Sequence, residues 1–260
     1  INERLEQMKN INEDSMRLLQ YDEKNMIAAF LKDTLIAQVD ESKLNKNQKQ
    51  LLQSLRAWNN FATAESANQT LFNAWCINLK SGLWEDEFGG KEMIYPTTDI
   101  SMRTVKFNIN RKWVDNSSTP QVETLNELIN HTYTATCDSL EREFGGDPEK
   151  WEWAMVKKTH VTHLLRIPAF SNTLVYTGGN SGIVNASGSD HGPSWRMIVE
   201  LGKEPKAYGL YPGGQSGNPG SPFYDNMIEP WSKGEQKELL ILHSAEEKNN
   251  HIVSSIVLKK

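Results

Sequence analysis

Cysteine, long apolar runs and an excess of positive charge are all scarce in this sequence. Its 260 residues include two cysteines, Cys76 and Cys137, so at most one disulfide can form; two buried thiols acting as small hydrophobes are the simpler interpretation. No apolar run approaches the roughly 20 residues that a helix needs to cross a bilayer, which excludes a membrane-spanning helix. The net charge of −5 and the lack of a dominant Lys/Arg cluster argue against nucleic-acid binding.

The rest of the composition is that of an ordinary globular chain. Apolar residues make up 38% and charged residues 23%, which is typical of a soluble protein with a sizeable core, arranged as one large domain or two. Ile1 is neither an initiator methionine nor the start of a signal peptide, because charged and polar residues follow it at once. We therefore expect the chain to begin inside a longer gene product.

Apolar residues spaced three and four apart predict that the first half is helical. The expected helices span residues 12–39, 47–58, 66–88 and 124–144, and a short one follows Asp147-Pro148. Ser66 and Thr124 begin the third and fourth of these helices, and a pair of glycines ends each one. A weakly patterned connector, broken by Pro96 and Pro120, lies between them.

After about residue 174 the pattern changes to short β-prone runs. These runs are LVY, GIVNA, WRMIVEL, AYGLY, ELLIL and HIVSSIVL, separated by glycine, proline, asparagine and serine. One helix, at about residues 224–231, interrupts them. The sequence therefore predicts an α+β fold, with a mainly helical region at 1–173 and a mostly antiparallel strand region at 174–260.

The glycine-rich stretch YPGGQSGNPGSPFYD, residues 211–225, raises the question of a phosphate loop or a nucleophile elbow. A phosphate loop needs a lysine followed by serine or threonine at the start of a helix, and this stretch has no lysine. A nucleophile elbow needs glycine two residues before and two residues after the serine. Ser216 has Gly214 before it but Asn218 after it, so neither chemistry is predicted here.

Other groups of reactive residue types are incomplete as well. Ser181 also lacks a glycine two residues after it. Ser189-Asp190-His191 are adjacent and cannot line up as nucleophile, base and orienter, which leaves a polar turn before the run WRMIVEL. Whether His191 and Arg196 make buried polar contacts that fix this turn stays open.

The histidine, tryptophan and acidic pairs have plain interpretations. His160 and His163 are spaced to share a helix face, but no third ligand is identifiable, so we predict no metal site. Trp151 and Trp153 are expected to anchor the core. The acidic runs at 85–87 and 246–247 are expected to be solvated. On residue chemistry alone the chain carries no complete catalytic set.

Three longer stretches are distinctive when taken together. They are GDPEKWEWAMVKKTHVTHLL, GGNSGIVNASGSDHGPSWRMIVELG and AYGLYPGGQSGNPGSPFYDNMIEPWSKGEQKELLI. In order and spacing they resemble the C-terminal part of the penicillin acylase (penicillin amidase) family, and residues 1–35 resemble the helices that follow its catalytic half. The motif residues expected to have structural roles are His191, Ser194, Arg196, Gln215, Ser216 and Asn218.

The resemblance implies an N-terminal-nucleophile hydrolase with a four-layer αββα core. In such enzymes a precursor is cleaved, the freed N-terminal serine of the large subunit attacks an amide carbonyl, and its own α-amine acts as the base. This chain departs from that pattern because Ile1 has no nucleophilic atom. The family's serine, oxyanion asparagine and calcium-binding acidic residues lie upstream of Ile1 in the resemblance, so no catalytic, substrate-binding or metal residue is carried over.

The resemblance accordingly implies a C-terminal portion of the large subunit, inactive alone and without a cofactor of its own. Its expected partners are the rest of the large subunit and the small subunit. The intact enzyme would cleave an acyl amide, such as a β-lactam side chain, in the periplasm or outside the cell. The alternative is a non-catalytic ligand-binding or interaction module that retains the family's scaffold.

Overall fold

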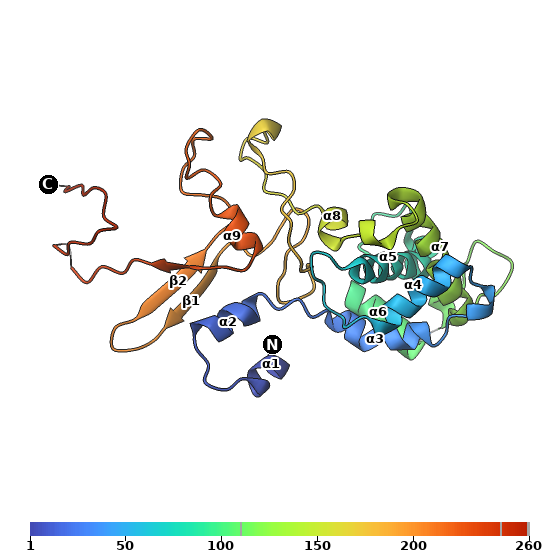
Figure 1. The fold of residues 1–260 in the computed structure, drawn as a ribbon. Coiled ribbons are helices and arrows are strands. Elements are labelled where there is room, and N and C mark those ends of the chain that lie inside the picture. Colours follow the sequence, from blue (N-terminus) through green and yellow to red (C-terminus); the bar gives the residue numbers. More distant parts are fainter. Residues whose placement is uncertain (110, 245, 259–260) are drawn as a thin grey trace.

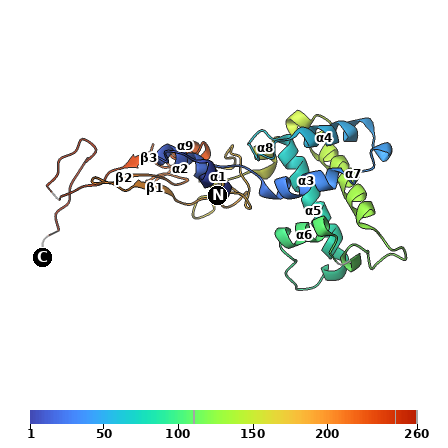
Figure 2. The ribbon, with the colours of Figure 1, turned by 90° about the horizontal axis from the view of Figure 1, so that it is seen from below.

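The computed structural model describes residues 1–109, 111–244 and 246–258. The molecule is elongated, with a helical body at one end and a small sheet at the other (Figures 1 and 2). Irregular loops join the two ends, and the C-terminal segment extends away from the sheet (Figure 1).

The helices and strands occupy the following residues. The α-helices are α1 (Asn2–Gln7), α2 (Glu13–Gln20), α3 (Met26–Ile36), α4 (Lys46–Ala57), α5 (Ala67–Phe88), α6 (Thr98–Phe107), α7 (Leu125–Phe144), α8 (Trp153–Lys157) and α9 (Ile228–Ser232). The 3₁₀ turns are η1 (Glu41–Lys43), η2 (Arg111–Trp113), η3 (Pro148–Lys150) and η4 (Pro168–Phe170). The strands are β1 (Arg196–Glu200), β2 (Lys206–Leu210) and β3 (Lys237–Leu239).

The two longest helices begin where their capping residues predict. The Ser66 side chain accepts a hydrogen bond from the Gln69 amide at the start of α5. At the start of α7, Thr124 and Glu127 form a reciprocal capping box. Both helices end at the first glycine of the predicted pair, so these predictions are confirmed.

The single helix predicted at 12–39 is wrong, because the chain breaks between α2 and α3. Its backbone there bonds to distant segments: the Asn25 amide donates to the Asn60 carbonyl at 2.8 Å, and the Ala62 amide donates to the Glu23 carbonyl at 2.9 Å. The Asn25 side chain then caps α3 through the Ala28 amide. Long-range hydrogen bonds thus override an apolar pattern that continues through the break.

Helix α5 is the centre of the helical body. Most of its large apolar side chains are buried; they include Leu71, Phe72, Trp75, Leu79 and Leu83, whose spacing places them along one face. The Trp75 ring lies 4.9 Å from the Tyr133 ring of α7, and its indole N–H donates to Thr132 Oγ1 at 3.2 Å. Burying one such side chain stabilises the folded state by about 1.5–3 kcal/mol. Because α5 supplies many of these side chains, it contributes a large part of the core of the helical body.

The cysteines lie in this core. Cys76 on α5 and Cys137 on α7 are both buried and unbonded to each other, as the simpler interpretation predicted. Burial raises the pKa of both thiols, to about 12 for Cys137. They therefore act as small hydrophobes.

The three strands form one antiparallel sheet in the order β1-β2-β3. Arg196 pairs with Leu210, and Ala207 pairs with Leu239. Helix α2 packs beside β1, where Gln20 Nε2 donates to the Met197 carbonyl at 3.0 Å, so the first helices lie with the sheet (Figure 1). The described part of the chain is therefore helix-rich with a small antiparallel sheet.

Half of the predicted strand runs are not strands. WRMIVEL contains β1, and AYGLY and ELLIL overlap β2 and β3, whereas LVY, GIVNA and HIVSSIVL are irregular. In the 177–188 loop the backbone groups bond to other parts of the chain instead: the Asn185 amide donates to the Asp22 carbonyl at 2.9 Å. The helix predicted at 224–231 is also shifted to Ile228–Ser232, because residues 221–224 form a turn.

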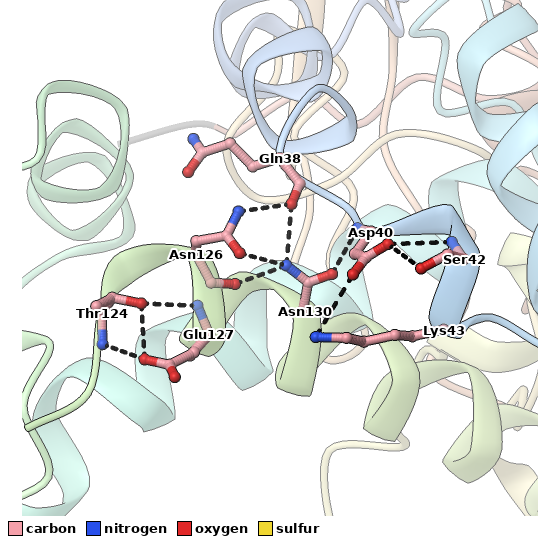
Figure 3. A network of polar contacts seen from close by, with 8 residues as sticks. All are labelled: Gln38, Asp40, Ser42, Lys43, Thr124, Asn126, Glu127 and Asn130. Carbon is pink, nitrogen blue, oxygen red and sulfur yellow. Dashed lines mark hydrogen bonds and ion pairs between the residues drawn. The ribbon is translucent and has the colours of Figure 1, made fainter. Parts of the chain in front are cut away.

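A polar network joins the end of α3 to the start of α7 (Figure 3). The side-chain amides of Asn126 and Asn130 both donate to the Gln38 carbonyl, at 2.8 and 2.9 Å. The Asp40 amide donates in turn to Asn130 Oδ1 at 2.7 Å. Asn130 thus supplies a donor for the Gln38 carbonyl and an acceptor for the Asp40 amide, two backbone groups that follow the end of α3.

Replacing Asn130 with Ala is expected to lower the free energy of unfolding by about 1–3 kcal/mol, because it leaves the Asp40 amide without its partner. The matched control is His131→Ala, which removes an exposed side chain from the next position of the same helix. Urea denaturation of both variants measures the difference. Equal losses for the two variants would contradict this role.

Candidate functional site

A cluster of charged and polar side chains lies where the helical body meets the sheet. We call Glu23, Lys157, Asn185 and Arg196 the junction cluster. They come from four segments that are distant in sequence: the break after α2, the end of α8, the 177–188 loop and the start of β1. The cluster therefore ties together parts of the chain that share no local structure.

Arg196 is the most buried charge in the cluster. Only 4% of it is exposed, and its guanidinium lies 5.2 Å from the Tyr21 ring and 5.1 Å from the Trp231 ring. Nη1 donates to the Trp231 carbonyl and Nη2 donates to Asn185 Oδ1, both at 2.8 Å. Burial lowers the pKa of Arg196, which stays charged because a guanidinium titrates far above neutral pH.

Lys157 holds the 177–188 loop from the side of the helical body. Its ammonium donates to the carbonyls of Gly178 at 2.5 Å and Ser187 at 3.1 Å. The indole of Trp153, one turn earlier, donates to the Gly179 carbonyl at 2.6 Å. Burial lowers the pKa of Lys157 to about 8, and the nearby Glu23 carboxylate opposes that shift.

Glu23 is the acidic member of the cluster. Asn185 Nδ2 donates to its carboxylate at 3.2 Å, so Asn185 connects Glu23 to Arg196. Burial raises the pKa of Glu23 to about 7, while the Asn185 hydrogen bond and the Lys157 charge act in the opposite direction.

The glycine pair of the loop is required by this close packing. A Cβ at Gly178 would lie 2.6 Å from the Ala62 carbonyl oxygen. Gly179 has φ of +79°, and a Cβ there would lie 2.2 Å from the Asn185 carbonyl oxygen. The GGNSGIVN part of the second distinctive stretch thus forms one side of the junction cluster.

A cleft of about 870 Å³ opens beside Glu23. Its lining carries four carboxylates, those of Glu23, Glu65, Asp225 and Glu229. The hydroxyls of Thr177 and Ser232, which also line it, donate to the carbonyls of Ser232 and Glu229. These two hydroxyls are therefore held by backbone carbonyls, while the Tyr176 hydroxyl, which also lines the cleft, donates to the Glu152 carboxylate at 2.9 Å.

The glycine-rich loop lines a second cleft, of about 1080 Å³, opposite residues 161–172. Ser216 Oγ accepts a hydrogen bond from the Asn218 amide at 3.1 Å, and Asn218 Oδ1 accepts one from the Gly220 amide at 3.0 Å. Gln215 is exposed and has no hydrogen bond among the residues that the structure describes. Ser216 and Asn218 thus stabilise the turns of their own loop.

His191 and Ser194 lie outside the junction cluster. Both are exposed, and His191 contacts the neighbouring Asp190 carboxylate at 2.8 Å. Of the pair left open by the sequence, only Arg196 makes buried polar contacts.

The two tryptophans have the role expected of them, whereas His160 and His163 do not lie on a helix. Trp151 and Trp153 are buried core residues. His160 and His163 contact only nearby backbone groups with their Nδ1 atoms. No group of three or more His, Cys, Asp or Glu side chains able to hold a metal ion occurs in the described ranges.

The family assignment follows from the sequence as a whole. The family model described as penicillin amidase matches residues 1–248. The chain belongs to the penicillin amidase family. No helix among the described residues is long and apolar enough to cross a membrane.

Similar proteins match over most of the chain. An acyl-homoserine lactone acylase QuiP of Pseudomonas syringae pv. syringae is 25% identical over 95% of this chain, which covers 34% of that protein. The QuiP of Pseudomonas aeruginosa is 23% identical over 69% of the chain, which covers 25% of that protein. The chain thus spans about a third or less of the length of these relatives.

A solved structure has a similar fold. The thermostable penicillin G acylase from Alcaligenes faecalis matches all of this chain with a TM-score of 0.59 and 13% identity. The match covers 51% of that protein's chain. At this identity the likeness shows the fold alone.

In the glycine-rich loop, Gly214→Ala is expected to lower the free energy of unfolding by about 1–3 kcal/mol, because overpacking forces the backbone to move. A Cβ there would lie 2.0 Å from the Phe223 carbonyl oxygen. Gly217→Ala is the control, since a Cβ at Gly217 meets nothing within 4 Å. Thermal unfolding measures both variants, and an undisturbed Gly214→Ala protein would show that the loop is loosely packed.

The stability of the junction cluster should depend on pH through Glu23. The folded state binds its proton more tightly than the unfolded state, whose carboxyl has a pKa near 4.5. The resulting stabilisation is present below pH 4.5 and is lost as the pH rises through about 7. The charged groups that act on Glu23 are Lys157, Arg196, Asp22 and Glu65.

Glu23→Gln is expected to remove this dependence. Its free energy of unfolding, relative to the unaltered protein, should increase between pH 5 and pH 7.5, because the glutamine amide never ionises. Urea denaturation across this range measures the difference. Parallel pH curves for the two proteins would rule out Glu23 as the group responsible.

Proposed function

We propose that this chain is the C-terminal portion of the large subunit of an N-terminal-nucleophile amide hydrolase, and that it supplies structure rather than reacting groups. The family match over residues 1–248 carries this proposal. The chain spans about a third of the length of its relatives, which supports a further part that holds the nucleophile. In addition, the hydroxyls of Thr177, Ser232 and Ser216, which line the two clefts, all bond to backbone groups.

The exposed face of the sheet supports a larger core. Trp195, Met197 and Val199 point to the face opposite Arg196, and all three are substantially exposed. On that face Gly209 lets the Trp195 ring and the Leu239 side chain approach, since a Cβ there would lie 2.8 Å from Trp195. An apolar sheet face of this kind packs against a second sheet about 10 Å away in a layered core.

The second layer would come from the rest of the precursor. In the αββα arrangement that the family resemblance implies, this sheet is covered on one face by helices and on the other by a second sheet. Helix α2 and the junction cluster already cover the Arg196 face. The proposed partners are therefore the N-terminal part of the large subunit and the small subunit, which would cover the Trp195 face.

The proposed reaction of the intact enzyme is hydrolysis of a linear N-acyl amide. An N-terminal serine attacks the amide carbonyl, and its α-amine, with a pKa of about 8, accepts the proton of the serine hydroxyl. The relatives named acyl-homoserine lactone acylases make N-acyl-homoserine lactones the first substrates to test, and penicillin side-chain amides the second. A periplasmic or secreted location, and a calcium ion held by the upstream part, belong to the same proposal.

The test compares the full-length precursor with the 260-residue chain. The processed precursor is expected to release acid from N-acyl-homoserine lactones or phenylacetyl amides, and the 260-residue chain is expected to release none under the same conditions. Replacing the precursor's N-terminal nucleophile with Ala is the matched control and should abolish release.

Two outcomes would overturn the proposal. Turnover by the 260-residue chain alone would mean that it holds its own reacting groups. A precursor with an inert residue at the nucleophile position and no turnover would favour the non-catalytic binding module.

A further inference from the structure

The C-terminal segment 251–258, HIVSSIVL, is an apolar tail that touches little of the described molecule. Val253, Ile256, Val257 and Leu258 are 99%, 85%, 78% and 92% exposed. The backbone bonds that the structure shows for this segment are local: the amides of His251 and Ile252 donate to Asn249. The tail also lies beyond residues 1–248, where the family match ends.

Such exposure is unusual for these residue types. Valine and isoleucine are stiff, β-branched residues that favour strands and half-buried surfaces. Successive side chains of a strand alternate between faces, so Val253 and Val257 would share one face, and Ile252 and Ile256 the other. Both faces of the tail are therefore apolar, as expected of a strand covered on two sides.

The sheet has an open edge at β3. In the part of the chain that the structure describes, β3 pairs only with β2, which leaves its outer edge unpaired. Beyond β3 the chain continues as Leu240, Ile241 and Leu242, which are exposed as well. A groove of about 540 Å³ lies at the end of the β2–β3 pair, lined by residues 204–206 and 238–241, and His251, the first residue of the tail, is part of its lining.

We propose that residues 251–257 pair antiparallel with the outer edge of β3 and its continuation through Leu242, as a fourth strand of the sheet. The polar connection after Leu242 lets the chain reverse direction, as a long hairpin loop does. The tail amides would then pair with the open edge, and its apolar side chains would extend the Trp195 face of the sheet. The occupant of the open edge is thus the chain's own C-terminal segment.

Charge favours this pairing as well. From Ile252 to Leu258 the tail has no charged side chain. The groove lining carries Lys206, Glu204 and Glu238, and the uncharged tail would place no like charge opposite them. The edge would also lose its capacity to pair with a strand of another molecule.

Cysteine pairs test the contact directly in the 260-residue chain. Leu240→Cys is combined with Val253→Cys, Ser254→Cys or Ser255→Cys, and disulfide formation is followed on non-reducing gels. The control combines the same tail cysteines with Glu200→Cys on β1, the opposite strand of the sheet. Native Cys76 and Cys137 are buried and do not compete.

We expect at least one Leu240→Cys combination to form an intramolecular disulfide at least about tenfold faster than its Glu200→Cys control, because bridged cysteines need Cα atoms within about 7 Å. Equal rates for both edges would overturn the proposal. Disulfides found only between chains would also overturn it, since they would show that a second copy occupies the edge.

Hydrogen exchange gives a second readout without added cysteines. The amides of residues 252–257 should exchange at least about tenfold more slowly in the unaltered protein and in Ser254→Ala than in Ser254→Pro, because proline removes a ladder N–H and fits poorly in a paired strand. Protection of the β2 amides should be the same in all three and shows that the sheet is folded. Unprotected tail amides in the unaltered protein, beside a protected β2, would overturn the proposal.

Discussion

The position of the sheet relative to the helices depends on one buried guanidinium. Arg196 cannot return to water without moving β1, and it cannot stay buried without partners, because an unpaired buried charge costs several kcal/mol. Its partners come from elsewhere: the Trp231 carbonyl after the glycine-rich loop, the Asn185 amide oxygen, and the Tyr21 ring beside α2. The requirement to satisfy one charge therefore fixes three segments at once.

The cluster around Arg196 extends this constraint into the helical body. Asn185 also donates a hydrogen bond to the Glu23 carboxylate. Lys157, on α8, donates to backbone carbonyls of the loop that carries Asn185. Burial raises the pKa of Glu23 and lowers that of Lys157. Because the two groups have opposite charges, each charge counteracts the shift of the other group. The cluster thus joins the sheet to the helical body, and Glu23 belongs both to it and to the lining of the cleft beside it.

Some features of the fold could be predicted from the sequence because their causes are local. Thr124 and Glu127 form a capping box within one turn, and Ser66 caps α5 in a similar way. Helix α6 could not be found, because its buried face includes Ser101 and Thr104, which no apolar pattern marks. Ser101 Oγ accepts a hydrogen bond from Trp84 Nε1, and the Thr104 hydroxyl donates to the Ile100 carbonyl of its own helix, so these polar side chains share the buried face with Met102 and Val105. The break before α3 was missed because its hydrogen-bond partners are distant in sequence.

The sequence by itself determined the family, the long capped helices and the absence of an elbow or phosphate loop in the glycine-rich stretch, since each rests on residue types at fixed spacing. Only the tertiary structure decided which motif residues share a site. It brought Arg196 together with Glu23, Lys157 and Asn185 and left His191 and Ser194 in solvent. The physical reason is that a buried charge selects its partners by distance in space, and sequence spacing does not record that distance.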